Sequence, residues 1–214
     1  MKIGVLGTGM VGITIATKLI QLGHHVTMGS RNPDNQTAAH WANANGVNAS
    51  RGTFTDAAMF SEMIILCTKG EATLEVIRTV GQDAFGEKVV VDVSNPLDFS
   101  RGMPPSLMIC NTDSLGEHVQ KVLPYARVVK TLNMVNCEVM TDPAKAGDPT
   151  MFLCGNHADA KRTATAMLFD FGWRDIVDLG DIKAARGMEM FVPAWLSLLN
   201  VVGHPAFGLK IVGR

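Results

Sequence analysis

The sequence predicts an α/β fold, with a doubly wound, mainly parallel sheet and a short C-terminal β-α-β-α extension. Apolar runs of strand length alternate with helical segments about six times over residues 1–135, the pattern of a parallel sheet with helices on both faces. Hydrophobic residues make up 47% of the chain and charged residues 18%, as expected when strands are buried on both sides. The 214 residues fit a single domain, in which residues 1–135 form the core and 136–214 extend the sheet and end in a helix.

The first strand-helix-strand unit has the spacing of a dinucleotide-binding turn. Apolar residues 3–6 lead into Gly7-Thr8-Gly9-Met10-Val11-Gly12 and then into a helix. In such a turn the first glycine permits the tight bend, the second lets a pyrophosphate approach, and the third lets helix pack on strand, with the phosphates at the helix N-terminus. Glycines also mark ordinary turns, but here strand, motif, helix and second strand follow in the required order.

The second strand, residues 25–28, ends in a segment that favours NADP(H) over NAD(H). An NAD site places a carboxylate there for the ribose 2′-hydroxyl, whereas this chain has Ser30, Arg31 and Asn32. A guanidinium beside a hydroxyl and an amide suits a 2′-phosphate, because charge-assisted hydrogen bonds bind it. Asn32 has a second interpretation, as the N-cap of a helix whose first turn holds Pro33 and Asp34.

The rest of the core follows from apolar runs, capping residues and turn signals. Gly46 ends one helix, Thr53 or Thr55 begins the next, and a capping box from Ser114 to Glu117 begins another. Residues 94–105 are expected to form a loop because they hold two turn-forming proline segments. We expect strands at residues 47–50, 63–67, 88–93 and 127–132, and helices at 33–45, 53–61, 71–80 and 114–123.

The C-terminal extension is expected to add strands at residues 150–154 and 175–179, with a helix at 158–171 between them. A final helix is the most clearly periodic segment of the chain. Its apolar residues recur at spacings of three and four, at Ala184, Met188, Phe191, Trp195, Leu198 and Val202. We expect this stripe to form a homodimer contact, with packing inside the chain as the alternative.

Composition and charge exclude several classes of function. The net charge of −1 and the lack of a basic run argue against nucleic-acid binding. The sequence offers neither an apolar stretch of about 18 residues for a membrane span nor a signal-peptide pattern, so we expect a cytoplasmic protein without membrane contact. Cys67, Cys110, Cys137 and Cys154 have no metal-binding spacing, so we expect buried free thiols and no metal site.

A catalytic acid or base is not evident in the sequence. His24, His25, His40, His118 and His157 fall at expected surface or helix positions, and no GxSxG, HExxH or Ser-Lys arrangement occurs. We therefore assign no catalytic residue. This suits hydride transfer between redox rings, which needs alignment and exclusion of water more than a proton-transfer group.

The ligand should lie at the carboxyl ends of the strands. The loops there are residues 7–12, 29–32, 68–70, 94–99 and 131–136, and the fourth begins with Ser94. Polar side chains in these loops can bind the ribose and the nicotinamide amide, while Pro96, Leu97 and Met134 can wall the ring. Alternatively, Asn95 only initiates a turn and Asn133 only caps a helix.

The chain resembles the NADPH-dependent reductases of coenzyme F420, and with them the cytosolic domain of STEAP-type metalloreductases. The resemblance spans nearly the whole chain and rests on IGVLGTGMVG, VTMGSRNP, VVVDVSNPLDFSRG, VVKTLNMVN and the short extension. It implies a Rossmann-like domain that binds NADPH, with Ser30, Arg31 and Asn32 on the 2′-phosphate. It further implies cofactor contacts from Thr8, Met10 and Val11 in the phosphate loop, from Thr68 and Lys69 beside it, and from Asn95, Pro96, Asn133 and Met134 at the hydride-transfer region.

The expected function is that of an NADP(H)-dependent oxidoreductase whose partner is a small-molecule redox acceptor, F420 or another flavin-type ring such as FMN or FAD. No family motif marks the acceptor pocket, to which Trp195 or His204 could contribute. One alternative is a redox sensor or scaffold that binds NADPH without turnover. Another is a short reductase of an imine or 2-keto acid, which the lack of a large helical substrate domain disfavours.

Overall fold

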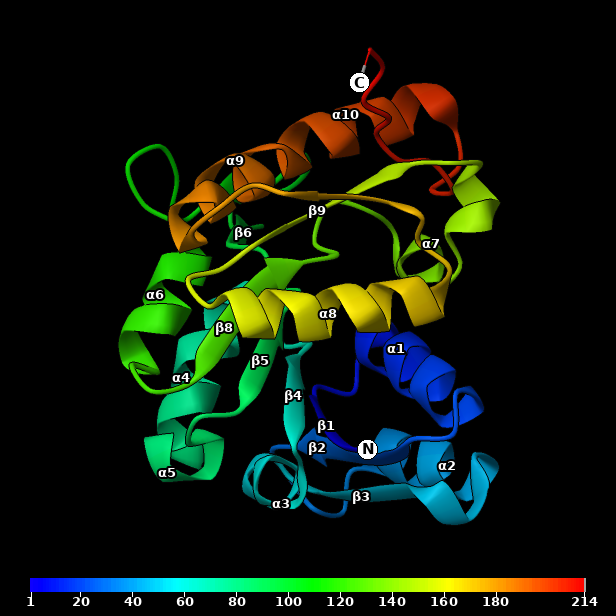
Figure 1. Ribbon diagram of the computed structural model, residues 1–214, viewed down its shortest axis with the longest axis vertical. Coiled ribbons are helices and arrows are strands. Elements are labelled where there is room, and N and C mark those ends of the chain that lie inside the picture. The colour runs from blue at the N-terminus through cyan, green and yellow to red at the C-terminus, as the bar shows by residue number, and fades with distance from the viewer. Residues whose placement is uncertain (214) are drawn as a thin grey trace.

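The computed structural model describes residues 1–213, and this part forms one sheet of eight strands with helices on both faces (Figure 1). The strand order is β10-β9-β8-β5-β4-β1-β2-β3. The parallel strands of the core are β1 (Lys2–Leu6), β2 (His25–Ser30), β3 (Ala49–Thr53), β4 (Met63–Leu66), β5 (Val89–Asp92) and β8 (Arg127–Thr131). The doubly wound, mainly parallel Rossmann-like sheet predicted from the sequence is confirmed.

The C-terminal extension continues the same sheet beyond β8. It consists of β9 (Thr150–Cys154), α8 (Ala158–Phe171) and β10 (Asp175–Asp178), close to the predicted ranges. β9 pairs antiparallel with β8, and β10 pairs parallel with β9. The extension therefore runs opposite to the core strands.

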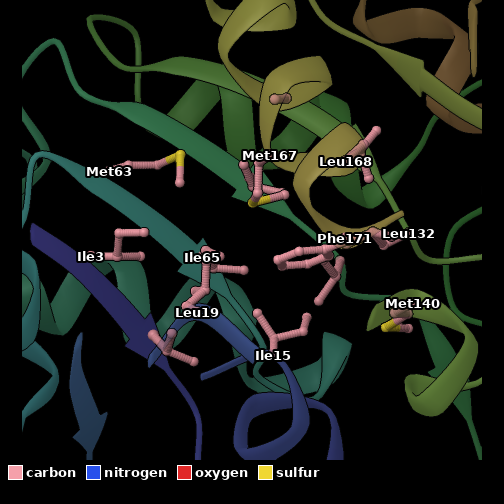
Figure 2. Packing of buried hydrophobic residues seen from close by; sticks show 14 of the residues in the cluster. Ile3, Ile15, Leu19, Met63, Ile65, Leu132, Met140, Met167, Leu168 and Phe171 are labelled. Atoms are coloured by element: carbon pink, nitrogen blue, oxygen red, sulfur yellow. The ribbon is translucent and has the colours of Figure 1, made fainter. Parts of the chain in front are cut away.

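The helices divide between two hydrophobic layers. One face of the sheet is covered by α1 (Met10–Gln21), α2 (Gln36–Ala44), α7 (Cys137–Thr141) and α8, and the other by α3 (Phe54–Phe60), α4 (Gly70–Val80), α5 (Gln82–Phe85), α6 (Leu115–Val122) and α9 (Ala185–Met190). Figure 2 shows the first layer, where Leu19 of α1 and Phe171 of α8 lie near Ile65 of β4. Continuous apolar strands such as β4 form because both of their faces are covered.

Two predictions near the second strand are wrong in detail. Asn32 does not cap α2: its side chain accepts a hydrogen bond from the Asp34 backbone at 2.9 Å, which closes a turn, and Asn35 caps the helix by accepting from Ala38 N at 2.9 Å. The third strand is residues 49–53 rather than 47–50, because a 3₁₀ turn (η1, Gly46–Asn48) uses the first of those residues. Thr53, not Thr55, caps α3 in a capping box with Asp56.

Two other segments also differ from expectation. The predicted loop at residues 94–105 contains β6 (Leu97–Asp98), which pairs with β7 (Ser106–Leu107) in a small antiparallel sheet. The final helix is not continuous: a 3₁₀ turn (η3, Ile182–Ala184) and α9 are followed by α10 (Val192–Val202). Pro193 lacks the N–H that would continue the hydrogen-bond ladder, so the helix breaks at Phe191.

The expectation of four buried thiols is only partly met. Cys154 is buried and Cys67 and Cys137 are half-buried, but Cys110 is exposed because the segment before α6 lies on the surface; all four are free. No helix among the described residues is long and apolar enough to cross a membrane. Within residues 1–213 no group of three or more His, Cys, Asp or Glu is placed to hold a metal ion.

Candidate functional site

A cleft of about 480 Å³ lies at the carboxyl ends of the central strands. The register aligns Leu6 of β1 with Leu66 of β4, and Leu66 with Asp92 of β5, so the three following loops begin at the same level. The chain reverses its winding between β1 and β4, which is where an open parallel sheet binds its ligand. The cleft is lined by Gly9, Met10, Val11, Cys67, Thr68, Lys69, Gly70, Glu71, Val93, Ser94, Asn95, Leu97 and Phe99.

The glycine turn has a different geometric reason at each of its three glycines. Gly7 has φ +132°, and a Cβ there would lie 2.5 Å from the Cys67 carbonyl oxygen. At Gly12 a Cβ would lie only 2.1 Å from the Gly7 carbonyl oxygen. At Gly9 a Cβ would meet nothing within 4 Å, and this residue is the N-cap of α1 with no side-chain cap. Gly7 and Gly12 thus hold the turn together, while Gly9 leaves open space at a helix N-terminus, a place suited to the pyrophosphate of a dinucleotide.

The segment after β2 borders a second, smaller hollow of about 210 Å³, lined by Ser30, Arg31, Thr53, Phe54, Thr55, Glu75, Val76 and Thr79. Ser30 is buried and donates its hydroxyl to the Asn32 carbonyl at 2.6 Å, which fixes the turn. Arg31 is exposed where it lines this hollow, whereas Asn32 is exposed but does not line it. The sequence pattern indicates only a capping role for Thr53 and Thr55; their position where a strand ends and a helix begins is the signal that could have placed them here.

The loops after β4 and β5 touch each other. A Cβ on Gly70 would lie 1.9 Å from the Asn95 carbonyl oxygen, so only glycine allows this approach. Thr68 lies beside them, with its hydroxyl 2.8 Å from that of Thr73. Lys69 is exposed at the N-cap of α4. The loop that carries the predicted residues Thr68 and Lys69 is therefore fixed against the loop that carries Asn95.

Asn133 contacts the loop after β5 without lining the cleft. Its amide nitrogen donates to the Asn95 Oδ1 at 2.9 Å, and the Asn95 amide donates to the Asn133 carbonyl at 2.9 Å. Asn133 is 3% exposed, and its own Oδ1 is buried without a partner. Pro96 is buried and Met134 half-buried, and neither they nor Asn133 line the cleft. Asn133 is not a helix cap, since Asn136 caps α7.

Two of the residues that line the cleft have large, exposed apolar side chains. Met10, at the start of α1, is 77% exposed, and Phe99, on the segment after β6, is 57% exposed. Apolar side chains beside a cleft can gain from contact with an apolar or aromatic ligand. Together they offer flat apolar contact at the mouth of the cleft.

Acid-base chemistry has little support in this cleft. Burial, reinforced by the charge of Asp92, raises the pKa of the Cys67 thiol far above its ordinary value, so this sulfur stays protonated and is not a nucleophile. Of the described residues that line the cleft, none is a histidine. His25, His40 and His204 are exposed on the surface, and His118 is hydrogen-bonded to Asp113 at 2.6 Å. The arrangement is suited to binding and aligning rings.

Sequence reasoning missed a fully buried charged cluster beneath the loop after β5. The Lys130 ammonium lies 2.9 Å from an oxygen of Asp92 and 2.9 Å from an oxygen of Glu189. The available signal was a charged residue inside each of the apolar runs VVVDV and RVVKTL, because a charge in a central strand must be paired.

Comparison with known proteins identifies related chains. Residues 2–96 match the family model described as NADP oxidoreductase, coenzyme F420-dependent. A solved structure of a putative F420-dependent NADP-reductase from Arthrobacter sp. FB24 is 42% identical, with a TM-score of 0.96 and full coverage of both chains. The F420-dependent NADP reductase of Methanocaldococcus jannaschii is 28% identical over 99% of this chain and 98% of its own length. Metalloreductase STEAP3 of Rattus norvegicus is 27% identical over 91% of this chain, but the match spans only 38% of the rat protein.

Proposed function

Because the chain belongs to the family of coenzyme F420-dependent NADP oxidoreductases, we propose that it transfers a hydride between NADP(H) and coenzyme F420 or a similar flavin-type ring. Membership of this family makes it an NADP(H)-dependent oxidoreductase. The observation that carries the finer proposal is the cleft itself, in which an open helix N-terminus at Gly9, two touching loops and two exposed apolar side chains surround one space.

The residues of the chain fit a dinucleotide laid across the carboxyl ends of the strands. The backbone from Gly9 to Val11 binds the pyrophosphate, and the hollow beside Ser30 and Arg31 takes the adenosine half with its 2′-phosphate. Thr68 and Asn95, which line the cleft on the other side of the phosphate loop, would hold the nicotinamide half. NADP(H) supplies the hydride chemistry at that ring.

The protein contributes alignment and exclusion of water. Phe99 and Met10 give apolar contact to a flat acceptor ring at the mouth of the cleft, and the protonated Cys67 adds no competing nucleophile. Holding two reactants in the correct geometry can supply about 7–11 kcal/mol of the barrier. Reduction of the acceptor ring by NADPH takes one hydride from the nicotinamide and one proton, and because solvent can supply the proton the chain need not provide a catalytic acid or base.

Anaerobic turnover tests the proposal. NADPH and enzyme are mixed with oxidised F420, FMN or FAD in parallel, and loss of the acceptor's visible band is followed. We expect bleaching with at least one of these rings that is faster than without enzyme. Tight NADPH binding with no oxidation by any of the three would reject the acceptor proposal and favour a redox sensor or scaffold without turnover.

A homodimer through α10 is part of the proposal. This helix is almost entirely apolar, yet Val192 is its only buried residue, while Leu198 is 43%, Val201 85% and Val202 41% exposed. A second copy of the chain would cover this surface symmetrically, as is common in soluble oligomers.

Free cysteines favour a reducing compartment, so we also propose a cytoplasmic location, which cell fractionation would test.

A further inference from the structure

The side chains of Lys130, Asp92 and Glu189 form a fully buried cluster in which every charged group has partners. Lys130 and Asp92 are 0% exposed and Glu189 is 1% exposed. The Lys130 ammonium contacts both carboxylates at 2.9 Å and donates its third hydrogen bond to the Ser94 carbonyl. Charged groups with this degree of burial occur only where each has partners.

The charges are balanced by named groups. The single positive charge of Lys130 balances one of the two carboxylates, Asp92. The second carboxylate, Glu189, contacts Lys130 too and in addition accepts hydrogen bonds from the backbone amides of Leu115 and Gly116, at 2.8 and 2.9 Å. These amides belong to the N-terminus of α6, where the helix dipole favours negative charge. Burial alone would lower the pKa of Lys130, but the two carboxylates outweigh it and raise that pKa, so the lysine is charged.

The cluster joins two parts of the chain that are far apart in sequence. Toward the cleft, Asp92 accepts from both the backbone and the hydroxyl of Ser94, at 2.9 and 2.6 Å, and Ser94 lines the cleft next to Asn95. Toward the C-terminus, Glu189 belongs to α9. A second set of hydrogen bonds connects the same two regions. The Asn133 side-chain amide donates both to Asn95 in the turn and, at 3.2 Å, to the Met188 carbonyl of α9.

We propose that Lys130, Asp92 and Glu189 form a positioning cluster, which fixes the turn at Ser94 and Asn95 for the nicotinamide half of the cofactor and couples that turn to α9. This inference rests on the proposed binding of NADP(H) in the cleft. None of the three residues lines the cleft, so they act through the backbone and side chain of the turn.

Stability alone is a weak reason for such a cluster. Buried ion pairs are often no more stabilising than well-packed apolar residues, because desolvating the charges offsets their attraction. The charged groups instead provide hydrogen bonds of defined direction. Each hydrogen bond fixes one group of the turn or one end of α9, as an apolar contact would not.

Two cluster variants and one control test the proposal. Glu189→Gln removes the charge that holds α9, and the double variant Lys130→Met with Asp92→Asn removes one charge of each sign, so the net charge of the cluster is kept. Gln120→Ala is the control: it removes the hydrogen bonds of 2.9 Å that the side chain donates to the Leu123 and Ala126 carbonyls at the C-terminal end of α6, and so loosens the same helix at the end away from Glu189. Folding of each variant is checked by circular dichroism at the assay temperature.

The readout is binding of NADPH compared with binding of 2′,5′-ADP, which has the adenosine half and the 2′-phosphate but no nicotinamide. For both cluster variants we expect the dissociation constant of NADPH to rise at least tenfold and that of 2′,5′-ADP to stay within twofold of wild type. Gln120→Ala should leave the ratio of the two constants unchanged. Equal weakening of both ligands, or no weakening of either, would overturn the positioning role.

Wild-type protein provides an independent measurement that needs no variant. NADPH should slow amide hydrogen exchange at residues 185–190 of α9 as well as at 93–95, although α9 does not line the cleft. Unchanged exchange at 185–190 would contradict the coupling. If the wild-type protein binds 2′,5′-ADP and NADPH equally weakly, or binds neither, the proposed cofactor site itself is rejected. Good NADPH binding without turnover would reject only the proposed acceptor.

Discussion

Replacing Gly9 by alanine separates the structural from the binding role of the glycine turn. Gly9 has φ −76° and ψ 178°, which alanine adopts without strain, and the added Cβ would meet no protein atom within 4 Å. Loss of glycine entropy in the unfolded chain stabilises by about 0.4–1 kcal/mol, and alanine is a poorer N-cap than glycine by a similar amount. The free energy of unfolding should therefore change by less than about 1 kcal/mol.

Binding should respond very differently, because the new methyl group occupies the open space in front of the helix N-terminus. If it displaces one charge-assisted hydrogen bond to the pyrophosphate, the loss is about 1.5–3 kcal/mol, or about 10- to 150-fold in the NADPH dissociation constant. Urea unfolding and a fluorescence titration with NADPH measure the two effects.

Gly12→Ala is the matched contrast within the same turn. Its Cβ would lie 2.1 Å from the Gly7 carbonyl oxygen, so the backbone must shift and the protein should lose about 1–3 kcal/mol or more of stability. A Gly9→Ala protein that binds NADPH as tightly as wild type would refute the assignment of this turn to the pyrophosphate.

Three further predictions follow from other parts of the molecule. Arg31→Ala should weaken NADPH by about 1–3 kcal/mol and leave NADH nearly unchanged in parallel titrations; equal loss for both would remove the case for a 2′-phosphate site. Hydrogen bonds from Arg186, at 2.6 and 2.8 Å, hold the pKa of Glu117 below its ordinary value. This pair therefore stabilises the fold fully above about pH 4.3, the ordinary pKa of a glutamate. The stabilisation is lost as the pH falls through the lowered pKa of Glu117 in the folded protein. Glu117→Gln should thus cost about 1 kcal/mol in urea unfolding at pH 7 and less at pH 3, and an equal cost at both would contradict the linkage. Val201→Lys, at an 85% exposed position of α10, should convert a dimer into a monomer by light scattering, whereas a monomeric wild type would disprove the dimer.

Much of the fold was predictable because parallel strands buried on both faces appear as uninterrupted apolar runs. Met63 to Leu66 and Val89 to Val91 show this pattern, and both are central strands. The antiparallel direction of β9 was not predictable, since a buried strand has the same pattern in either direction. The break at Phe191 was missed because apolar periodicity continues across Pro193, while the missing N–H acts only on the backbone.

The site was predictable where one loop carries its own signal, and not where the signal depends on packing. Local spacing predicted cofactor contacts at the glycine turn and at Ser30, Arg31 and Asn32; the structure places part of the turn in the cleft, and Ser30 and Arg31 in the smaller hollow. The pairing of Asn133 with Asn95, and of Lys130 with Glu189, joins residues 38 and 59 positions apart, and only the fold brings them together. This is why sequence reasoning placed Asn133 at the cleft surface, whereas it lies behind Asn95.

Direct transfer of the hydride is the central claim, and isotope transfer tests it. Enzyme is mixed anaerobically with oxidised F420 and NADPH that carries deuterium at nicotinamide C4, in each of its two stereochemical forms, and the reduced acceptor is analysed by mass spectrometry. We predict that one form delivers its deuterium to the acceptor and the other does not, because the cleft fixes a single face of the ring. Reduced acceptor without deuterium from either form would contradict face-to-face transfer.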